Sequence, residues 1–87
     1  MLLKKIRVAK TLLRGICFLD NEYIFIGCDD KVIRLVNYKN GKIMYNLSNH
    51  IERVVSIKVI NHPKYGKCLL SQSGDFDSIK IWVIKSN

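Results

Sequence analysis

An internal repeat constrains the fold of this chain more than any other feature of its sequence. Shifted by 46 positions (82 minus 36), Ile33–Val36 lies on Ile79–Trp82, and Asp29 lies on Asp75. In both tetrapeptides a basic residue stands between two apolar ones, which is typical of a β-strand with one solvated face. Periods of about 20 to 50 residues belong to solenoids, propellers and similar arrays. The chain is therefore expected to contain one supersecondary unit nearly twice.

Upstream of these segments the repeat contains an insertion. The 46-residue shift also places Tyr23-Ile24 on Leu69-Leu70, whereas Ile16–Phe18 needs a shift of 41 (57 minus 16) to reach Ile57–Val59. The five-residue difference falls in the segment 61–66, which contains Pro63 and Gly66. Loops absorb insertions at little energetic cost, so one unit of four strands accounts for both shifts.

The composition favours strands over helices. The chain has 12 Ile and 7 Val but a single Ala, and β-branched residues suit pleated sheets whereas Ala is the best helix former. Codon bias in an AT-rich genome would also enrich Ile, Lys and Asn. Turn signals, of which Asn40-Gly41 is the strongest, recur about every ten residues. The strands predicted between them are Leu3–Val8, Leu12–Leu19, Tyr23–Cys28, Val32–Val36, Ile43–Leu47, Val54–Ile60, Lys67–Ser71 and Ile79–Ile84.

The second unit carries motif residues of a known repeat family. Asn49-His50 stands where that family has Gly-His, and Ile79–Trp82 ends on the Trp of its Trp-Asp pair. The chain from about residue 12 to residue 87 thus resembles the WD-repeat family, and the second unit resembles the final repeats of protist WD-repeat proteins. It departs from the pattern at Val83, which replaces the Asp, and at Phe76, six residues before the Trp. The first unit is degenerate, with Val36-Asn37 at the Trp-Asp position.

The resemblance implies an all-β fold of two four-stranded antiparallel propeller blades. Residues 12–49 would form a degenerate repeat and residues 50–87 a repeat that ends at its third strand. Residues 1–11 would form an N-terminal strand able to close a blade. Because closed propellers have about 4 to 8 blades, two blades imply the end of a larger propeller, or a fragment that assembles with further blades or other copies.

The resemblance also assigns roles to single residues. A buried hydrogen-bonded network would join four of them: His50, Ser71 (or Ser73), Asp75 (or Asp77) and Trp82. Such a network fixes strand register when every member is satisfied. Protein partners of the family often dock on loops between blades and between second and third strands. Those positions are Glu52, Arg53, Asp30, Lys31 and Phe76 here.

No residue pattern predicts catalysis. His50, Ser71 and Asp75 superficially match a Ser-His-Asp triad, but a triad needs an exposed nucleophile and an oxyanion hole. His62 is expected to be a solvated loop residue. The glycines are scattered singly, and the paired carboxylates occupy turns, where Asp bonds to its own backbone. We expect no enzyme activity, no cofactor and no metal site.

The net charge of +8 raises an alternative function. Lys and Arg supply the charge that dominates nucleic-acid binding, so a basic nucleic-acid-binding β domain is the alternative to a protein–protein interaction and scaffold module. The basic residues are spread along the chain, however, and aromatic residues do not line one strand as a stacking platform would require. Attraction to acidic protein surfaces is the simpler expectation.

Cysteines and hydropathy bear on the compartment. Cys17, Cys28 and Cys68 are odd in number and lie far apart in apolar runs, which predicts buried free thiols rather than a disulfide framework or a zinc site. The basic start also resembles a transit peptide, but an exposed strand face followed by a turn is the preferred interpretation. No apolar run approaches the length of a membrane span. These features predict an intracellular protein, cytoplasmic or nuclear, without a membrane partner.

Overall fold

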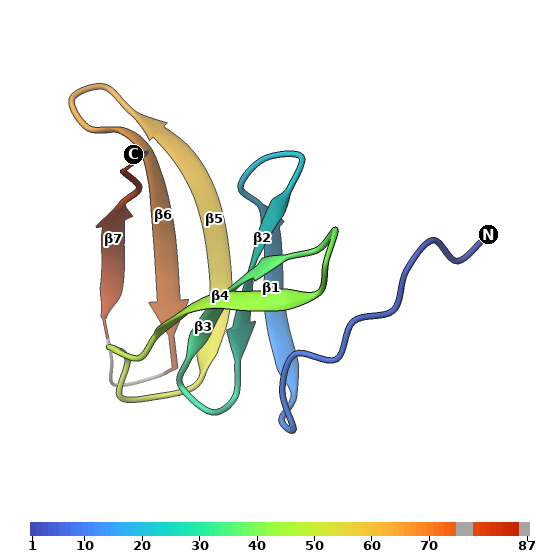
Figure 1. Ribbon diagram of the computed structural model, residues 1–87. Coiled ribbons are helices and arrows are strands. Elements are labelled where there is room, and N and C mark those ends of the chain that lie inside the picture. The colour runs from blue at the N-terminus through green and yellow to red at the C-terminus, as the bar shows by residue number, and fades with distance from the viewer. Residues whose placement is uncertain (75–77, 86–87) are drawn as a thin grey trace.

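Seven antiparallel strands form two sheets in the computed structural model of the protein, which describes residues 1–74 and 78–85. Each sheet is a meander, so strands that are consecutive in sequence are neighbours in space (Figure 1). The first sheet contains β1 (Leu13–Phe18), β2 (Tyr23–Cys28), β3 (Ile33–Asn37) and β4 (Lys42–Leu47). The second contains β5 (Val54–His62), β6 (Gly66–Ser73) and β7 (Ile79–Val83). The all-β prediction is confirmed, and the described residues contain no helix.

Short polar turns with specific hydrogen bonds join the strands of the first sheet. Between β1 and β2, the carboxylate of Asp20 accepts hydrogen bonds from the backbone of Glu22 (2.8 Å) and Tyr23 (2.9 Å). Between β3 and β4, Gly41 adopts φ 76°, a left-handed conformation that glycine tolerates without a side-chain clash. The Asn40-Gly41 hairpin is thus confirmed, although its turn spans residues 38–41 rather than two residues.

The second sheet has three strands among the described residues, which is the number in a four-stranded blade that ends at its third strand. One strand prediction needs correction. Leu3–Val8 forms no strand: residues 1–9 have no regular structure and pair with neither sheet. A short segment gains strand geometry only where a partner strand accepts its backbone hydrogen bonds. Here the segment is held instead by Val8, which is 7% exposed and packs on Ile24 and Val36.

The pairing registers also refine the internal repeat. Ile16 of β1 corresponds to Ile57 of β5 by the shift of 41. Ile16 pairs with Ile26 and Ile57 pairs with Ser71, so Ile26 corresponds to Ser71 and the shift between β2 and β6 is 45 (71 minus 26). The shift is 46 between β3 and β7, where Arg34 corresponds to Lys80. The sequence-based alignment of Tyr23-Ile24 with Leu69-Leu70 is therefore wrong by one residue. Four inserted residues lie between β5 and β6 (45 minus 41) and one lies between β6 and β7 (46 minus 45).

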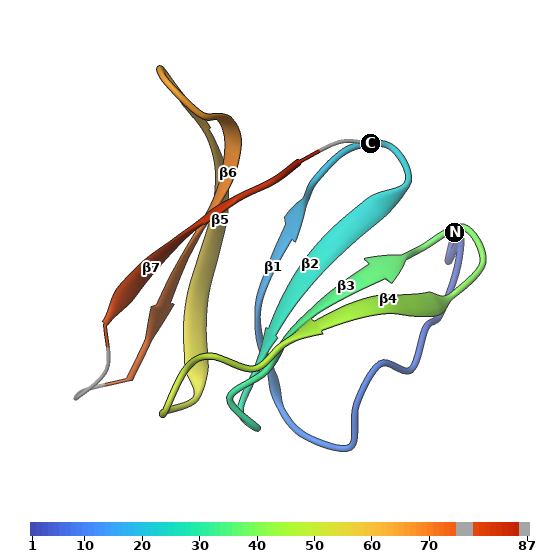
Figure 2. The same ribbon diagram turned by 60° about the vertical axis from the view of Figure 1, so that its left-hand side comes forward.

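The two sheets pack face to face at their first strands, β1 and β5, and diverge toward β4 and β7 (Figure 2). Gly15 and Gly27 are paired across β1 and β2. A Cβ atom at Gly27 would lie 2.7 Å from Val54 Cγ1, and one at Gly15 would lie 3.2 Å from Ile57 Cγ1. The glycine pair therefore lets β5 approach the backbone of the first sheet closely.

The inner faces of the two sheets build the main core. Phe25 and Ile33 of the first sheet contact Val54, Ile57 and Leu69 of the second, and all five side chains are at most 9% exposed. Alternation along the strands sends the other side chains to the opposite faces. We call these the outer face of the first sheet (Ile16, Phe18, Ile24, Ile26 and Val36) and the outer face of the second sheet (Leu70, Ile79, Ile81 and Val83).

Candidate functional site

A buried chain of hydrogen bonds joins three of the four residues expected to form a network. The Nε1–H of Trp82 donates to Ser71 Oγ over 2.8 Å, and the same oxygen lies 2.8 Å from His50 Nε2. Ser71 is fully buried and His50 is 5% exposed. Ser71 lies on β6, Trp82 on β7 and His50 before β5, so the contacts tie the incoming chain to both strands. Asp75 and its alternative Asp77 lie outside the described residues.

The alternative serine takes no part in the network. Ser73 is 6% exposed, and its hydroxyl has no hydrogen-bond partner within the part of the chain that the structure describes. Ser71 is thus the serine that contacts both His50 and Trp82. Its oxygen is enclosed and already engaged by two nitrogen atoms, which leaves no access for a substrate carbonyl. This geometry differs from that of an activated serine nucleophile, which must be reachable from solvent.

The expected partner-binding loops gather at one end of the two sheets, the lower end in Figure 1. Glu52 and Arg53 precede β5, whereas Asp30 and Lys31 join β2 to β3. The backbone of Arg53 accepts a hydrogen bond from Gly74 (3.1 Å), which connects the loop before β5 to the end of β6. Lys31 is exposed and adopts φ 72°. Phe76 lies outside the described residues.

Two ion pairs engage Asp29 and Asp30 at this end. Arg34 donates two hydrogen bonds to Asp30, at 2.7 and 3.0 Å, and lowers the pKa of that carboxyl. Arg14 likewise bonds to Asp29, at 2.7 and 3.0 Å, and lowers its pKa. Both carboxylates therefore serve the turn between β2 and β3. Asp30 is engaged within its own sheet, although its sequence position suggested a partner contact.

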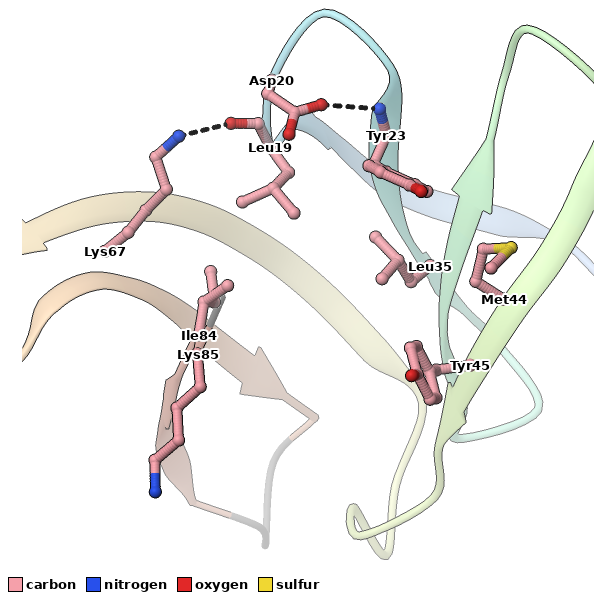
Figure 3. A pocket seen from close by; sticks show the side chains of 9 residues that line it. All are labelled: Leu19, Asp20, Tyr23, Leu35, Met44, Tyr45, Lys67, Ile84 and Lys85. Atoms are coloured by element: carbon pink, nitrogen blue, oxygen red, sulfur yellow. Dashed lines mark hydrogen bonds between the residues drawn. The ribbon is translucent and has the colours of Figure 1, made fainter. Parts of the chain in front are cut away.

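A large hollow lies between the diverging parts of the two sheets, and sequence reasoning missed it. This cleft has a volume of about 600 Å³, and Figure 3 shows its lining. Its aliphatic and aromatic lining residues are Leu19, Tyr23, Leu35, Met44, Tyr45 and Ile84. A second hollow of about 260 Å³ shares Leu35, Tyr45, Ile84 and Lys85 with the cleft and extends it to Trp82. No local motif marks this groove, because it arises from the angle between the sheets.

Polar groups surround the mouth of the cleft. Lys67 of β6 donates a hydrogen bond to the carbonyl of Leu19 over 2.8 Å, which ties the two sheets together at this end. Lys85 follows β7, and Asp20 lies on the side of the first sheet (Figure 3). Tyr45 remains 65% exposed although its ring lines the groove. The cleft thus combines an apolar floor with two ammonium groups, one carboxylate and a large exposed aromatic side chain.

The remaining candidates for chemistry are engaged in structure. His62 Nδ1 accepts hydrogen bonds from the backbone of Lys64 (3.1 Å) and Tyr65 (3.2 Å), so it closes the turn between β5 and β6. The three cysteines are free thiols, as predicted, but only Cys28 and Cys68 are buried, whereas Cys17 is half-buried. Burial raises the pKa of the Cys17 and Cys28 thiols, which disfavours the reactive thiolate. Among residues 1–74 and 78–85, no group of three or more His, Cys, Asp or Glu side chains could hold a metal ion.

Comparisons with known proteins leave the chain without an assigned family. No family model matches its sequence, and no curated protein matches it significantly. None of the described segments forms a helix with the length and hydropathy needed to cross a membrane.

Proposed function

We propose that this chain is a non-catalytic protein–protein interaction module, built from two blades of the WD-repeat type as part of a larger propeller. The observation that carries the proposal is the chain of hydrogen bonds from His50 through Ser71 to Trp82. All three residue types stand where the WD-repeat resemblance places them. Ser71 and His50 are buried and Trp82 is half-buried, which supports a structural role, since enclosed polar groups that satisfy one another hold strands in register.

The arrangement of the sheets supports the same proposal. Two antiparallel meanders stack face to face, touch at their first strands and splay apart toward their last strands. Propeller blades radiate in this way from a shared axis. The register shifts of 41, 45 and 46 residues also make β1, β2 and β3 equivalent to β5, β6 and β7.

The cleft between the sheets is the surface best suited to a partner. An apolar groove with a few charged groups at its mouth can take an apolar side chain of an extended segment and fix its orientation. Lys67 and Lys85 at the mouth favour acidic residues beside that apolar anchor. Tyr45 is exposed, aromatic and backed by the sheet, which are properties of residues that dominate interface energies. We therefore assign the partner as a protein segment with an apolar anchor flanked by Asp or Glu.

Selection from a random peptide library tests this function. We expect immobilised chain to enrich peptides with an apolar anchor next to acidic residues, and calorimetry to give affinities that Tyr45→Ala weakens at least tenfold. Tyr65→Ala is the matched control, because Tyr65 is 53% exposed but lies in the turn between β5 and β6. Both variants should keep the wild-type unfolding temperature. Enriched peptides that bind equally well to wild type and Tyr45→Ala would exclude the cleft as the binding surface.

A further inference from the structure

The outer face of the second sheet exposes apolar side chains along β7, and Lys58 of β5 lies on the same face opposite Leu70. Ile79 is 65% exposed, Ile81 is 60% exposed and Val83 is 43% exposed, and all three lie on β7 beside Leu70 of β6. Contiguous apolar surface of this kind usually marks an interaction site.

The internal repeat identifies a surface that matches this face. By the register shifts, Leu70, Ile79 and Ile81 correspond to Phe25, Ile33 and Leu35 of the first sheet (45, 46 and 46 residues). Those three residues form the inner face of the first sheet, which packs on the second sheet. The outer face of the second sheet is thus equivalent to a face that is already covered by a sheet.

The covering face has its own equivalent in the same chain. Ile57, Leu69 and Trp82 of the second sheet pack against the first sheet. They correspond to Ile16, Ile24 and Val36, with shifts of 41, 45 and 46 residues, and these lie on the outer face of the first sheet. The chain therefore presents both halves of its internal interface a second time, on opposite outer faces.

An N-terminal arm, residues 6–9, covers part of the outer face of the first sheet. Val8 is 7% exposed and packs with Ile24, Ile26 and Val36, while Ile6 and Ala9 flank it. Figure 2 shows the arm on the side of the first sheet away from the second. Ile16 and Phe18 of the same face stay 67% and 65% exposed beyond the arm. The arm has no strand pairing, so apolar contacts provide most of its attachment.

We propose that further copies of this chain supply the neighbouring blades of the larger propeller. They bind head to tail, with the outer face of the first sheet of one copy against the outer face of the second sheet of the next, after the arm has left. The contact continues the internal interface and extends beyond the proposed partner binding, since it uses neither the cleft nor an acidic peptide. Gly15 and Gly27, which allow close approach inside the chain, correspond to Ser56 and Gln72 (shifts of 41 and 45). The larger side chains keep the copies farther apart, so the association is transient and concentration-dependent.

Two complementary variants test the head-to-tail geometry. Ile81→Lys removes the outer face of the second sheet, and Ile16→Lys removes that of the first. Each side chain is at least 60% exposed, so both variants should fold. By sedimentation at high concentration, each variant alone should stay at the monomer mass of 10.1 kDa, and their equimolar mixture should double it. Wild type, which keeps both faces, should grow beyond a dimer, because a heterologous contact continues until a ring closes. Tyr65→Lys is the control and should behave like wild type.

Other outcomes overturn the proposal. A mixture that remains monomeric would exclude the contact. Dimerisation of Ile16→Lys alone would show that two second sheets pair symmetrically. In either case peptide binding in the cleft would be unaffected, so the proposed function is judged separately.

A third variant tests the arm. The Ile81→Lys variant keeps the outer face of its first sheet, so the arm is weakened in that variant by a second change, Val8→Ala or, where the fold tolerates it, Val8→Asp. The double variant is then mixed with Ile16→Lys. If the arm covers that face nine-tenths of the time, releasing it should tighten the mixed dimer by about tenfold. An unchanged dissociation constant, with the fold intact by circular dichroism, would show that the arm does not compete with the second copy.

Discussion

The glycine pair between the sheets allows a quantitative test of the core. Replacing Gly27 by Ala adds a Cβ atom 2.7 Å from Val54 Cγ1 and 3.2 Å from Val54 Cβ. Favourable contacts between carbon atoms have separations of about 3.5–4.0 Å. The sheets must therefore move apart by several tenths of an ångström, or Val54 must leave its rotamer. Val54 is fully buried, so neither adjustment is free of cost.

The expected magnitude follows from two opposing terms. Overpacking by one methyl group costs about 1–3 kcal/mol, and the lower entropy of the unfolded Ala variant returns about 0.4–1 kcal/mol. The net destabilisation of Gly27→Ala should be about 1–2 kcal/mol. At about 4–8 °C per kcal/mol for a domain of this size, the unfolding temperature should fall by roughly 4–16 °C.

Thermal unfolding followed by circular dichroism measures this shift, and Gly74→Ala is the matched control. The added Cβ atom at Gly74 would have its nearest neighbour, Glu52 Cβ, at 3.6 Å, an ordinary contact. That variant should be neutral or slightly stabilised. Combining Gly27→Ala with Val54→Ala removes the closest overlap, so the double variant should lose less stability than the sum of the single effects. A Gly27→Ala protein as stable as wild type, or strictly additive effects with Val54→Ala, would refute the close packing of β2 on β5.

Two further predictions concern the hydrogen bonds and the ion pairs. Ser71→Ala should lower the free energy of unfolding by about 1–3 kcal/mol, because Trp82 and His50 lose a shared buried partner. Ser73→Ala is the control and should be neutral or stabilising. Equal stability of the two variants in urea unfolding would contradict the network. Because Arg34 lowers the pKa of Asp30 in the folded state, the pair stabilises the fold above the unfolded pKa of about 3.9 and loses this effect as the pH falls through the folded value. The stability difference between wild type and Arg34→Met should therefore shrink when urea titrations go from pH 6 to pH 2, and a constant difference would show that the pair does not contribute.

Local patterns predicted most strands because each strand has its own alternation and turn. Tyr23–Cys28 was predicted with its observed bounds, and Asn40-Gly41 marked its hairpin. Leu3–Val8 has an equally good alternation but forms no strand. Strand formation depends on a partner elsewhere in the chain, which a local pattern does not reveal. For the same reason, the one-residue error in aligning Leu69-Leu70 appeared only when the pairing of β5 with β6 was known.

In the candidate site, too, the sequence predicted one part, the hydrogen-bonded network, and did not predict the other, the cleft. His50, Ser71 and Trp82 were predicted together because their residue types and spacing match a repeat pattern, and the structure brings them within hydrogen-bond distance. The cleft had no such signal, because Met44 and Tyr45 read as ordinary strand residues. Their role follows from the divergence of the two sheets. That divergence depends in turn on the close contact of β5 with Gly27, a long-range feature.

The net charge and the apolar outer faces have opposite effects on association between copies of this chain. The dependence on salt therefore distinguishes self-association from binding to nucleic acid. Each copy has a net charge of +8, which opposes contact between copies over distances comparable to the Debye length, about 10 Å at 0.1 M salt. Most side chains on the two outer faces are apolar, although Arg34 lies on the first face and Lys58 on the second. The attraction between the apolar side chains does not depend on screening. Added salt should therefore strengthen association between copies, whereas binding of the same basic residues to nucleic acid weakens steeply with salt. A self-association that disappeared as salt was raised would mean that charge, and not the apolar faces, holds the copies together.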